Sequence, residues 1–447
     1  MTASKRLTLL LAAAAVSGCS SLGGLWPFRG GPSEAPADTQ EGRISILTFE
    51  QKFEADPGLR GTLSLPEPQA LAAWPQPGGG PENAPGSIAG AEEPRIVWRQ
   101  GVGGVEESRA RLSAPPVIAD GRIYVLAGRQ TARAFDAKTG ADLWTRRLRS
   151  ENPRDKFAQG GGVAVADGRV FVTSGYGFIA ALDAATGQEL WRTATNAPFS
   201  AAPTAAGGRV FASTNDSELL AFDAATGAVL WTHQAIAEPA RVLSSSSPAV
   251  TADAVIAPFA SGEVVALSPA NGRRLWVDSL SRAGRLTSLS SINDVAGRPA
   301  VQGGAVYAAS HSGLLAGIDQ RSGQRAWDAP VASTQTPYVA GDALFVLTTE
   351  AELAALDRIT GKVFWIFPLA RYENIKKRKG RISWTGPILF GGNLVVASSQ
   401  GSLAFIDPVD GAPKRTVRLG DAVFIPPVAA DGMLYVLTNE GRLIALR

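Results

Sequence analysis

Residues 221–231 read Ala-Phe-Asp-Ala-Ala-Thr-Gly-Ala-Val-Leu-Trp, and the chain repeats this stretch with variations. The core pattern, Asp-x-x-Thr-Gly-x-x-x-Trp, occurs at Asp136–Trp144, Asp183–Trp191 and Asp223–Trp231. Looser copies stand at Ser268–Trp276, Asp319–Trp327, Asp357–Trp365 and Asp407–Arg415. Self-similarity at intervals of about 40 to 50 residues is typical of a repeat architecture, in which each unit packs on its neighbours.

Each repeat contains short strands separated by tight turns. In residues 200–231, alternating stretches such as Arg209–Ser213 and Leu219–Phe222 lie between clusters of Gly, Asn and Asp, which is the pattern of β-hairpins. In the repeated corner, the Asp and Thr side chains can hydrogen-bond nearby backbone groups, and the Gly can take a positive φ. The Trp has a large ring with one N–H donor, which suits the seam between neighbouring sheets.

Strands of the Arg-Val-Phe type occur eight times, against seven corners, which indicates that the two ends of the chain meet. The chain stops at Leu443–Arg447, before an eighth corner, whereas a spare Trp strand, Pro94–Trp98, stands near its beginning. Pairing of these two strands would complete the last sheet and remove the free edges of a ring. The sequence therefore predicts an all-β fold: an eight-bladed β-propeller of four-stranded blades over residues 91–447, with about 45 residues per blade.

The first residues have the pattern of a bacterial lipoprotein signal. Lys5-Arg6 precedes an apolar run, and small residues follow before the cut, which predicts a signal peptide over residues 1–18. Val16-Ser17-Gly18-Cys19 resembles a lipobox, in which Cys19 carries the lipid and becomes the first residue of the mature chain. An ordinary cleaved signal with an incidental Cys is the alternative. Ser20 rather than Asp follows Cys19, so we expect the outer membrane, with the protein facing the periplasm.

Residues 19–90 are interpreted as a lipidated flexible tether, because they are rich in Pro and Gly and weakly patterned. The alternating apolar patch Arg43–Phe49 is an exception and could dock on the propeller or on a partner. Cys19 is the only cysteine, so no disulfide within the chain is possible. No segment of the ring is long and apolar enough to cross a bilayer.

The residues of the ring give no pattern typical of catalysis or of metal binding. The two histidines, His233 and His311, are far apart in sequence, and neither is expected to bind a metal. Ser244–Ser247 has no neighbouring base and is interpreted as a polar loop. The Asp residues of the corners recur with the repeat, which favours a structural role. We therefore expect no catalytic residue, no metal and no cofactor.

The repeat resembles that of the quinoprotein alcohol dehydrogenases, which are eight-bladed propellers that bind pyrroloquinoline quinone (PQQ). That resemblance implies a vicinal disulfide, a calcium site and, in some members, a haem motif. The single cysteine excludes the disulfide and the haem motif here. A quinone-dependent dehydrogenase and a propeller that binds cell-wall material or another ligand remain the alternatives to a scaffold.

Taken together, the lipobox, the tether and the eight repeats resemble the BamB family, lipoproteins of the machinery that assembles outer-membrane β-barrels. The resemblance implies a non-enzymatic scaffold that binds the POTRA domains of the barrel-inserting subunit and helps present unfolded outer-membrane protein clients. It assigns partner contacts to two loops. Residues 240–248 carry Arg241, Val242 and Leu243, although the family's Arg position is not matched. Residues 291–299 carry Asp294 and Val295, and Ala296 replaces the family's second Asp.

The densest basic run in the chain is Ile375-Lys-Lys-Arg-Lys-Gly-Arg381. A solvated loop, an anionic lipid head group and an acidic partner are all compatible with such a run. The net charge of the whole chain is only +3, so no general basic field supports binding of nucleic acid.

Overall fold

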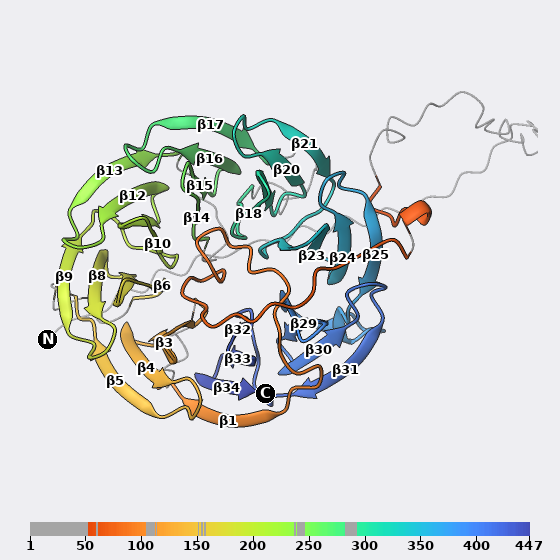
Figure 1. Ribbon diagram of the computed structural model, residues 1–447, viewed down its shortest axis with the longest axis horizontal. Helices are drawn as coiled ribbons and strands as arrows, with labels where there is room; N and C mark the ends of the chain where they lie inside the picture. The colour runs from red at the N-terminus through yellow and green to blue at the C-terminus, as the bar shows by residue number, and fades with distance from the viewer. Residues whose placement is uncertain are drawn as a thin grey trace, which may run out of the picture. The chain divides into compact units, whose positions relative to one another are not determined.

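The computed structural model describes residues 52–59, 61–103, 112, 114–150, 152, 155, 158–236, 238, 246–281 and 293–447. Residues 51–447 form one compact unit. A short 3₁₀-helix, η2 (Pro57–Leu59), precedes a ring of strands, which Figure 1 shows viewed along its axis. Within the described residues, no helix is long and apolar enough to cross a membrane.

Eight four-stranded antiparallel sheets are arranged around the ring as blades. The first four blades comprise β2 (Val117–Ala119), β3 (Arg122–Ala127), β4 (Thr131–Asp136) and β5 (Asp142–Arg147); β6 (Gly161–Ala166), β7 (Arg169–Ser174), β8 (Phe178–Asp183) and β9 (Glu189–Ala194); β10 (Thr204–Ala206), β11 (Arg209–Ser213), β12 (Glu218–Asp223) and β13 (Val229–Gln234); β14 (Ala249–Val250), β15 (Val255–Pro258), β16 (Glu263–Leu267) and β17 (Arg274–Ser279).

The last four blades comprise β18 (Ala300–Gln302), β19 (Ala305–Ala309), β20 (Leu315–Asp319) and β21 (Arg325–Ala329); β22 (Tyr338–Ala340), β23 (Ala343–Leu347), β24 (Glu352–Asp357) and β25 (Val363–Pro368); β28 (Trp384–Phe390), β29 (Asn393–Ser398), β30 (Ser402–Ile406) and β31 (Pro413–Arg418); β32 (Val428–Ala430), β33 (Met433–Leu437), β34 (Arg442–Leu446) and β1 (Ile96–Gly101). A two-stranded sheet of β26 (Tyr372–Asn374) and β27 (Lys379–Arg381) lies between the sixth and seventh blades along the chain.

The eighth blade is completed as the sequence predicted. Strand β1 pairs antiparallel with β34, with Ile96 opposite Leu446 and Gly101 opposite Arg442. The innermost three strands of this blade come from the end of the chain, and the outermost comes from its beginning. The eight-bladed β-propeller of four-stranded blades, closed by N-terminal strand pairing, is therefore confirmed.

The repeated corner links a blade to the one before it at seven of the eight seams of the described ring. In the copy at Asp223, the carboxylate accepts hydrogen bonds from the backbone N–H of Thr226 (2.8 Å) and from its hydroxyl (2.8 Å). Gly227 has φ +76°, and a Cβ there would lie 2.4 Å from the ring of Trp191 on the preceding blade. Trp191 Nε1 donates to the carbonyl of Ala224, in the same corner (3.2 Å). The Gly thus leaves room for the ring, and the Asp–Thr turn presents the carbonyl that the ring binds.

Arg415 stands where the seventh corner lacks its Trp. The neighbouring blade is the eighth, in which β1 takes the place of a strand that would follow a corner. Arg415 Nη2 donates instead to the carbonyl of Pro94, just before β1 (2.8 Å), and its guanidinium lies 4.5 Å from the ring centroid of Phe405. A longer, cationic side chain therefore replaces Trp at the seam between the seventh blade and the eighth, the blade in which β1 pairs with β34.

The predicted boundary of the tether at residue 90 differs from the structure. Residues 69–90, here called the central segment, cross the middle of the ring and bind every blade (Figure 1). The contacts, in blade order, are Trp74 with Ile118, Pro75 with Val165, Gln76 with Ala205, Pro81 with Val250, Glu82 with Val301, Gly86 with Tyr338, Ile88 with Leu389, and Leu71 with Asp431. The Pro and Gly content suggested a flexible linker. In the structure, these residues instead form turns in an irregular segment that runs from one blade to the next. The patch 43–49 lies outside the described residues.

Candidate functional site

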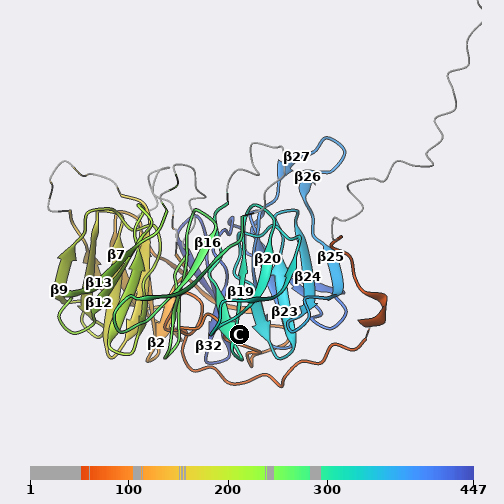
Figure 2. The same cartoon turned by 90° about the horizontal axis from the view of Figure 1, so that it is seen from above.

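The rim of the ring opposite the central segment carries the described ends of the links that join each outer strand to the next blade. In Figure 2 the β26–β27 hairpin stands on this side, whereas the central segment runs along the other. The link from β17 to β18 covers residues 280–299, and the link from β13 to β14 covers residues 235–248. Both predicted partner loops belong to these links. We call this side the loop rim.

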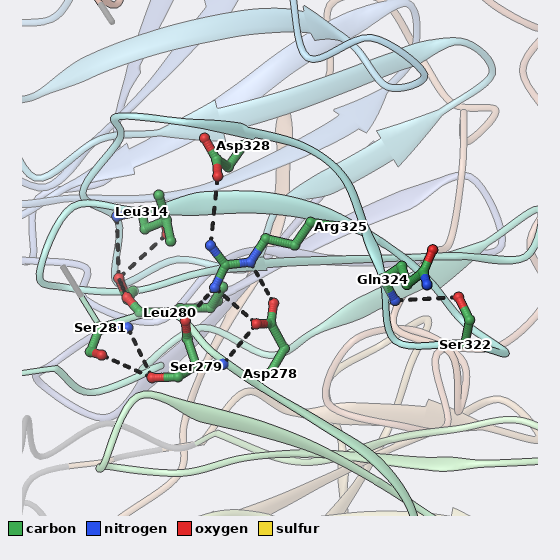
Figure 3. A network of polar contacts seen from close by, with 10 residues as sticks. Asp278, Ser279, Leu280, Ser281, Leu314, Ser322, Gln324, Arg325 and Asp328 are labelled. Carbon is green, nitrogen blue, oxygen red and sulfur yellow. Dashed lines mark hydrogen bonds and ion pairs between the residues drawn. The ribbon is translucent and has the colours of Figure 1, made fainter. Parts of the chain in front are cut away.

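A polar network fixes the start of the 280–299 link (Figure 3). Arg325 on β21 of the fifth blade binds Asp278 on β17 of the fourth blade through two hydrogen bonds of 2.7 and 2.9 Å. This hydrogen bonding to the Asp278 carboxylate raises the pKa of the Arg325 guanidinium. Arg325 also donates to the backbone carbonyl of Ser279. The bidentate pair therefore joins two outer strands just where the link begins.

Buried hydroxyl groups hold the next residue of the link. The carbonyl of Leu280 accepts hydrogen bonds from Ser310 Oγ (2.8 Å) and Ser312 Oγ (3.2 Å), both on the fifth blade. The side chain of Leu280 is wholly buried. The link is therefore tied to the body of the propeller up to Leu280, and its next described part begins at Asn293.

Of the residues predicted to bind a partner, Asp294 and Val295 return to the body of the ring. Val295 is 0% exposed and packs in a core that includes Ala249 of the fourth blade and Val301 of the fifth. Asp294 is 6% exposed, and its carbonyl accepts a hydrogen bond from the N–H of His311 (2.9 Å). The side chain of Val295 is buried in this conformation, and its role as a partner contact stays a prediction. The sequence could not reveal this burial, because the covering residues come from two other blades.

The other predicted partner residues, Arg241, Val242 and Leu243, lie outside the described residues. Their link becomes described again at Ser246, whose hydroxyl donates to the carbonyl of Gly297 (3.2 Å). Ser247 Oγ donates to the carbonyl of Ala202 (2.8 Å), so both described residues of the predicted polar loop are bonded to backbone carbonyls. The bond from Ser246 to Gly297 places the ends of the two predicted loops side by side on neighbouring blades.

Arg298, at the end of the second loop, is a buried cation that the sequence reasoning missed. Its side chain is 6% exposed, its Nε has no hydrogen-bond partner in the described structure, and Nη1 lies 3.5 Å from Thr336 Oγ1. Burial lowers the pKa of its guanidinium to about 10, so the group stays protonated at neutral pH. The only available signal was a charged residue directly before Pro299 at the start of an inner strand.

Within the described residues, no group of three His, Cys, Asp or Glu side chains is placed to hold a metal ion. His233 lies beside Phe259, with the ring centroids 6.3 Å apart, and burial lowers the pKa of its imidazole. His311 is on a different blade, where its backbone binds the Asp294 carbonyl. The arrangement on the loop rim therefore consists of adjacent loops anchored by hydrogen bonds and an ion pair, which is chemistry suited to contact with another molecule.

Eight blades joined by the Trp–Gly corner define a propeller of the PQQ-like-repeat class. The family model described as outer membrane protein assembly factor BamB matches residues 88–159, 154–367 and 373–447. The chain belongs to this family. A curated relative of the same name from Salmonella typhimurium is 28% identical over 358 residues, which cover 79% of this chain and 88% of the relative.

Two solved structures show how widely the fold is shared. BamB from Moraxella catarrhalis superposes with a TM-score of 0.67 at 20% identity, covering 79% of this chain and 100% of that one. Quinohemoprotein alcohol dehydrogenase from Comamonas testosteroni superposes with a TM-score of 0.63 at 14% identity, covering 84% of this chain and 80% of that one. At these identities the superpositions show the fold alone, so the family assignment rests on the sequence matches.

Proposed function

We propose that this protein is a scaffold subunit in the assembly of β-barrel proteins into the outer membrane. The observation that carries the proposal is the match of the BamB family model to nearly all of the propeller, from residue 88 to residue 447. The relatives are named outer membrane protein assembly factors. The proposal assigns no catalytic step to the chain, although the same fold occurs in a quinohemoprotein dehydrogenase.

We place the contact with the barrel-inserting subunit on the loop rim, where its POTRA domains would meet the paired loops. The bond from Ser246 to Gly297 supports this choice, because it makes one surface out of two links. Arg241, Val242 and Leu243 are the proposed contacts from the first loop. Asp294 lies at the base of the second loop and is only 6% exposed. Its proposed role is therefore to hold the base of that loop in place, and not to contact the partner directly.

The proposed location follows from the first residues of the chain. Lipid on Cys19 would hold the protein at the outer membrane on its periplasmic side, and residues 20–51 would connect the anchor to the propeller. Unfolded clients could add a strand to an exposed outer blade edge, since that recognition mode needs only unpaired backbone groups. The outer strand β13, with Val229 and Leu230 exposed, has such an edge.

Affinity purification of the tagged, lipidated protein from mildly solubilised outer membranes tests the proposal. Mass spectrometry should identify the POTRA-bearing subunit, and Leu243→Glu should reduce its recovery about tenfold or more, because a charge replaces an apolar contact. Leu190→Glu is the matched control, since Leu190 is 49% exposed on β9, away from the loop rim. Equal recovery with both variants would move the interface elsewhere. Recovery of a cytochrome without assembly subunits would instead favour the dehydrogenase alternative.

A further inference from the structure

The β26–β27 hairpin is a separate structure built on the loop rim. It occupies the link between the sixth and seventh blades, with Tyr372 opposite Arg381 and Asn374 opposite Lys379. Figure 2 shows it standing clear of the blades. A strand pair that extends a link in this way adds nothing to the core of the ring, because all nine residues from 373 to 381 are exposed. Packing within the propeller therefore does not explain the residue types of the hairpin.

The shape of the hairpin is fixed at both ends. At its base, the N–H of Ile382 donates to the carbonyl of Arg371 (3.0 Å), and Trp384 Nε1 donates to the carbonyl of Ala370 (2.8 Å). At its tip, the N–H of Lys377 donates to Asn374 Oδ1 (2.9 Å), a bond that closes the loop between the two strands. The hairpin thus holds its tip at a set distance from the ring.

The tip is strongly basic, and its charges are not used within the described structure. Lys376, Lys377, Arg378 and Lys379 are all exposed, and none has an ion-pair partner among the described residues. The one carboxylate on the hairpin, that of Glu373, accepts a hydrogen bond from Gln400 Nε2 (2.6 Å). The whole chain carries only +3, so four adjacent cations make this tip a local exception.

An exposed aliphatic side chain accompanies these cations. Ile375 is 75% exposed, more than any other large hydrophobic residue in the described structure. An apolar side chain beside flexible lysines matches the chemistry of a bilayer surface, where the aliphatic group enters the head-group layer and the cations meet phosphates. Three of the four cations are Lys, which bind as point charges without the fixed geometry that Arg brings to a carboxylate.

We propose that the β26–β27 hairpin is a membrane-contact element that binds the phosphate groups of an anionic lipid surface and inserts Ile375 among the head groups. The exposed Ile375 favours a lipid surface over an acidic protein partner, because a head-group layer admits an aliphatic side chain without a preformed apolar pocket. The binding depends on the hairpin alone and not on the assembly that the propeller joins, so its test is independent of the proposed function.

Vesicle co-sedimentation tests the proposal with the mature chain from residue 19 carrying Cys19→Ala, so that no lipid anchor contributes. Vesicles of phosphatidylcholine with about 30 mol% phosphatidylglycerol should bind the protein, and vesicles of phosphatidylcholine alone should not. Replacing Lys376, Lys377, Arg378 and Lys379 by Gln should weaken the binding about tenfold or more. Ile375→Ser should weaken it by a smaller factor, about threefold to tenfold, and this loss should persist at higher salt.

A control variant removes the same charge from scattered exposed sites: Lys138→Gln, Arg147→Gln, Arg273→Gln and Arg321→Gln. It should bind anionic vesicles nearly as well as the parent, and all variants should keep the parent's melting temperature. Equal losses in the clustered and scattered variants would overturn the site. Unchanged binding of Ile375→Ser would overturn the insertion. Absence of vesicle binding, together with loss of a protein partner from the clustered variant in affinity purification, would overturn the lipid assignment in favour of an acidic partner.

Discussion

The face of the ring crossed by the central segment and the loop rim use the same eight blades in opposite ways. On the first face, the central segment forms a hydrogen bond with each blade, and most of these bonds join backbone to backbone. On the loop rim, the link between the sixth and seventh blades carries an exposed basic hairpin. The first face therefore satisfies its own polar groups, whereas the loop rim leaves the charges of the hairpin exposed, and it is the side on which we propose contact with other molecules.

The difference has a physical origin in what each contact requires. Backbone bonds at the inner strands need only the right path of the chain, so Pro- and Gly-rich sequence can make them. At the loop rim, side-chain bonds between blades provide the anchoring instead, as where Arg325 and Asp278 fix the base of a long link. Disturbing one face should therefore change stability, and disturbing the other should change binding.

Removal of residues 441–447 should have the largest effect, because it destroys the ring on which both faces depend. The deletion takes away β34, which joins β33 to β1 in the eighth blade. Leu443, Ile444 and Leu446 are all wholly buried, and each buried side chain contributes about 1.5–3 kcal/mol. We expect loss of cooperative unfolding in thermal circular dichroism. A melting temperature equal to that of the full chain would contradict closure through this blade.

Gln76→Leu should destabilise the propeller without changing what the loop rim binds. The amide of Gln76 donates to the carbonyls of Val165 (3.3 Å) and Ala205 (3.1 Å) and accepts from the N–H of Ala205 (3.1 Å). Leucine would leave these buried groups unpaired, at a cost of roughly 2–4 kcal/mol in the free energy of unfolding, measured in urea.

The matched control is Gln69→Leu in the same segment. The Gln69 side chain is exposed and reaches only the carbonyl of Glu67, two residues away (3.1 Å), so we expect a change within about 0.5 kcal/mol. Similar losses from both substitutions would mean that the central segment contributes little through Gln76. Reduced partner recovery by Gln76→Leu would mean that the two faces are coupled.

Acid should weaken the ring through its repeated corners, with a smaller effect. Hydrogen bonds from the Thr or Ser of each corner, first from its hydroxyl, lower the pKa of Asp136, Asp183, Asp223 and Asp319 below the ordinary value of 3.8. A carboxyl whose folded pKa is depressed stabilises the fold above its unfolded pKa, and this contribution disappears as the pH falls through the folded value.

The melting temperature should therefore be steady near neutral pH and decline below about pH 4. Asp223→Asn should lower it at pH 7, with a difference from the parent that shrinks toward pH 3. A difference that stays constant over this range would show that the corner acts through shape and not through the ionised carboxylate.

Much of the fold could be predicted because its determinants are local and repeated. The Asp-x-x-Thr-Gly corner closes on itself, as in the bonds from Thr226 to Asp223, so each copy forms the same turn. Its Gly and Trp recur at a fixed spacing, and that spacing puts Trp191 against Gly227 in the next blade. The missing eighth corner was visible by counting, and pairing of β1 with β34 followed from it.

The candidate site could be predicted only in outline. The two loops were suggested by the resemblance to the BamB family, but the burial of Val295 and of Arg298 depends on neighbouring blades. Composition also misassigned the central segment, because the same Pro and Gly residues serve a free linker and an irregular chain that packs on a surface. The basic run at Lys376–Arg381 was evident, whereas its presentation on a separate hairpin was not.

The sequence by itself determined the number of blades, the way the ring closes and the chemistry of the seams. These features rest on residues close together in the chain and repeated, so a local pattern encodes them. The tertiary structure alone decided that the central segment binds all eight blades, that Arg415 reaches Pro94, and that Ser246 meets Gly297. Such contacts join residues far apart in the chain, and only the folded ring brings their atoms within hydrogen-bonding distance.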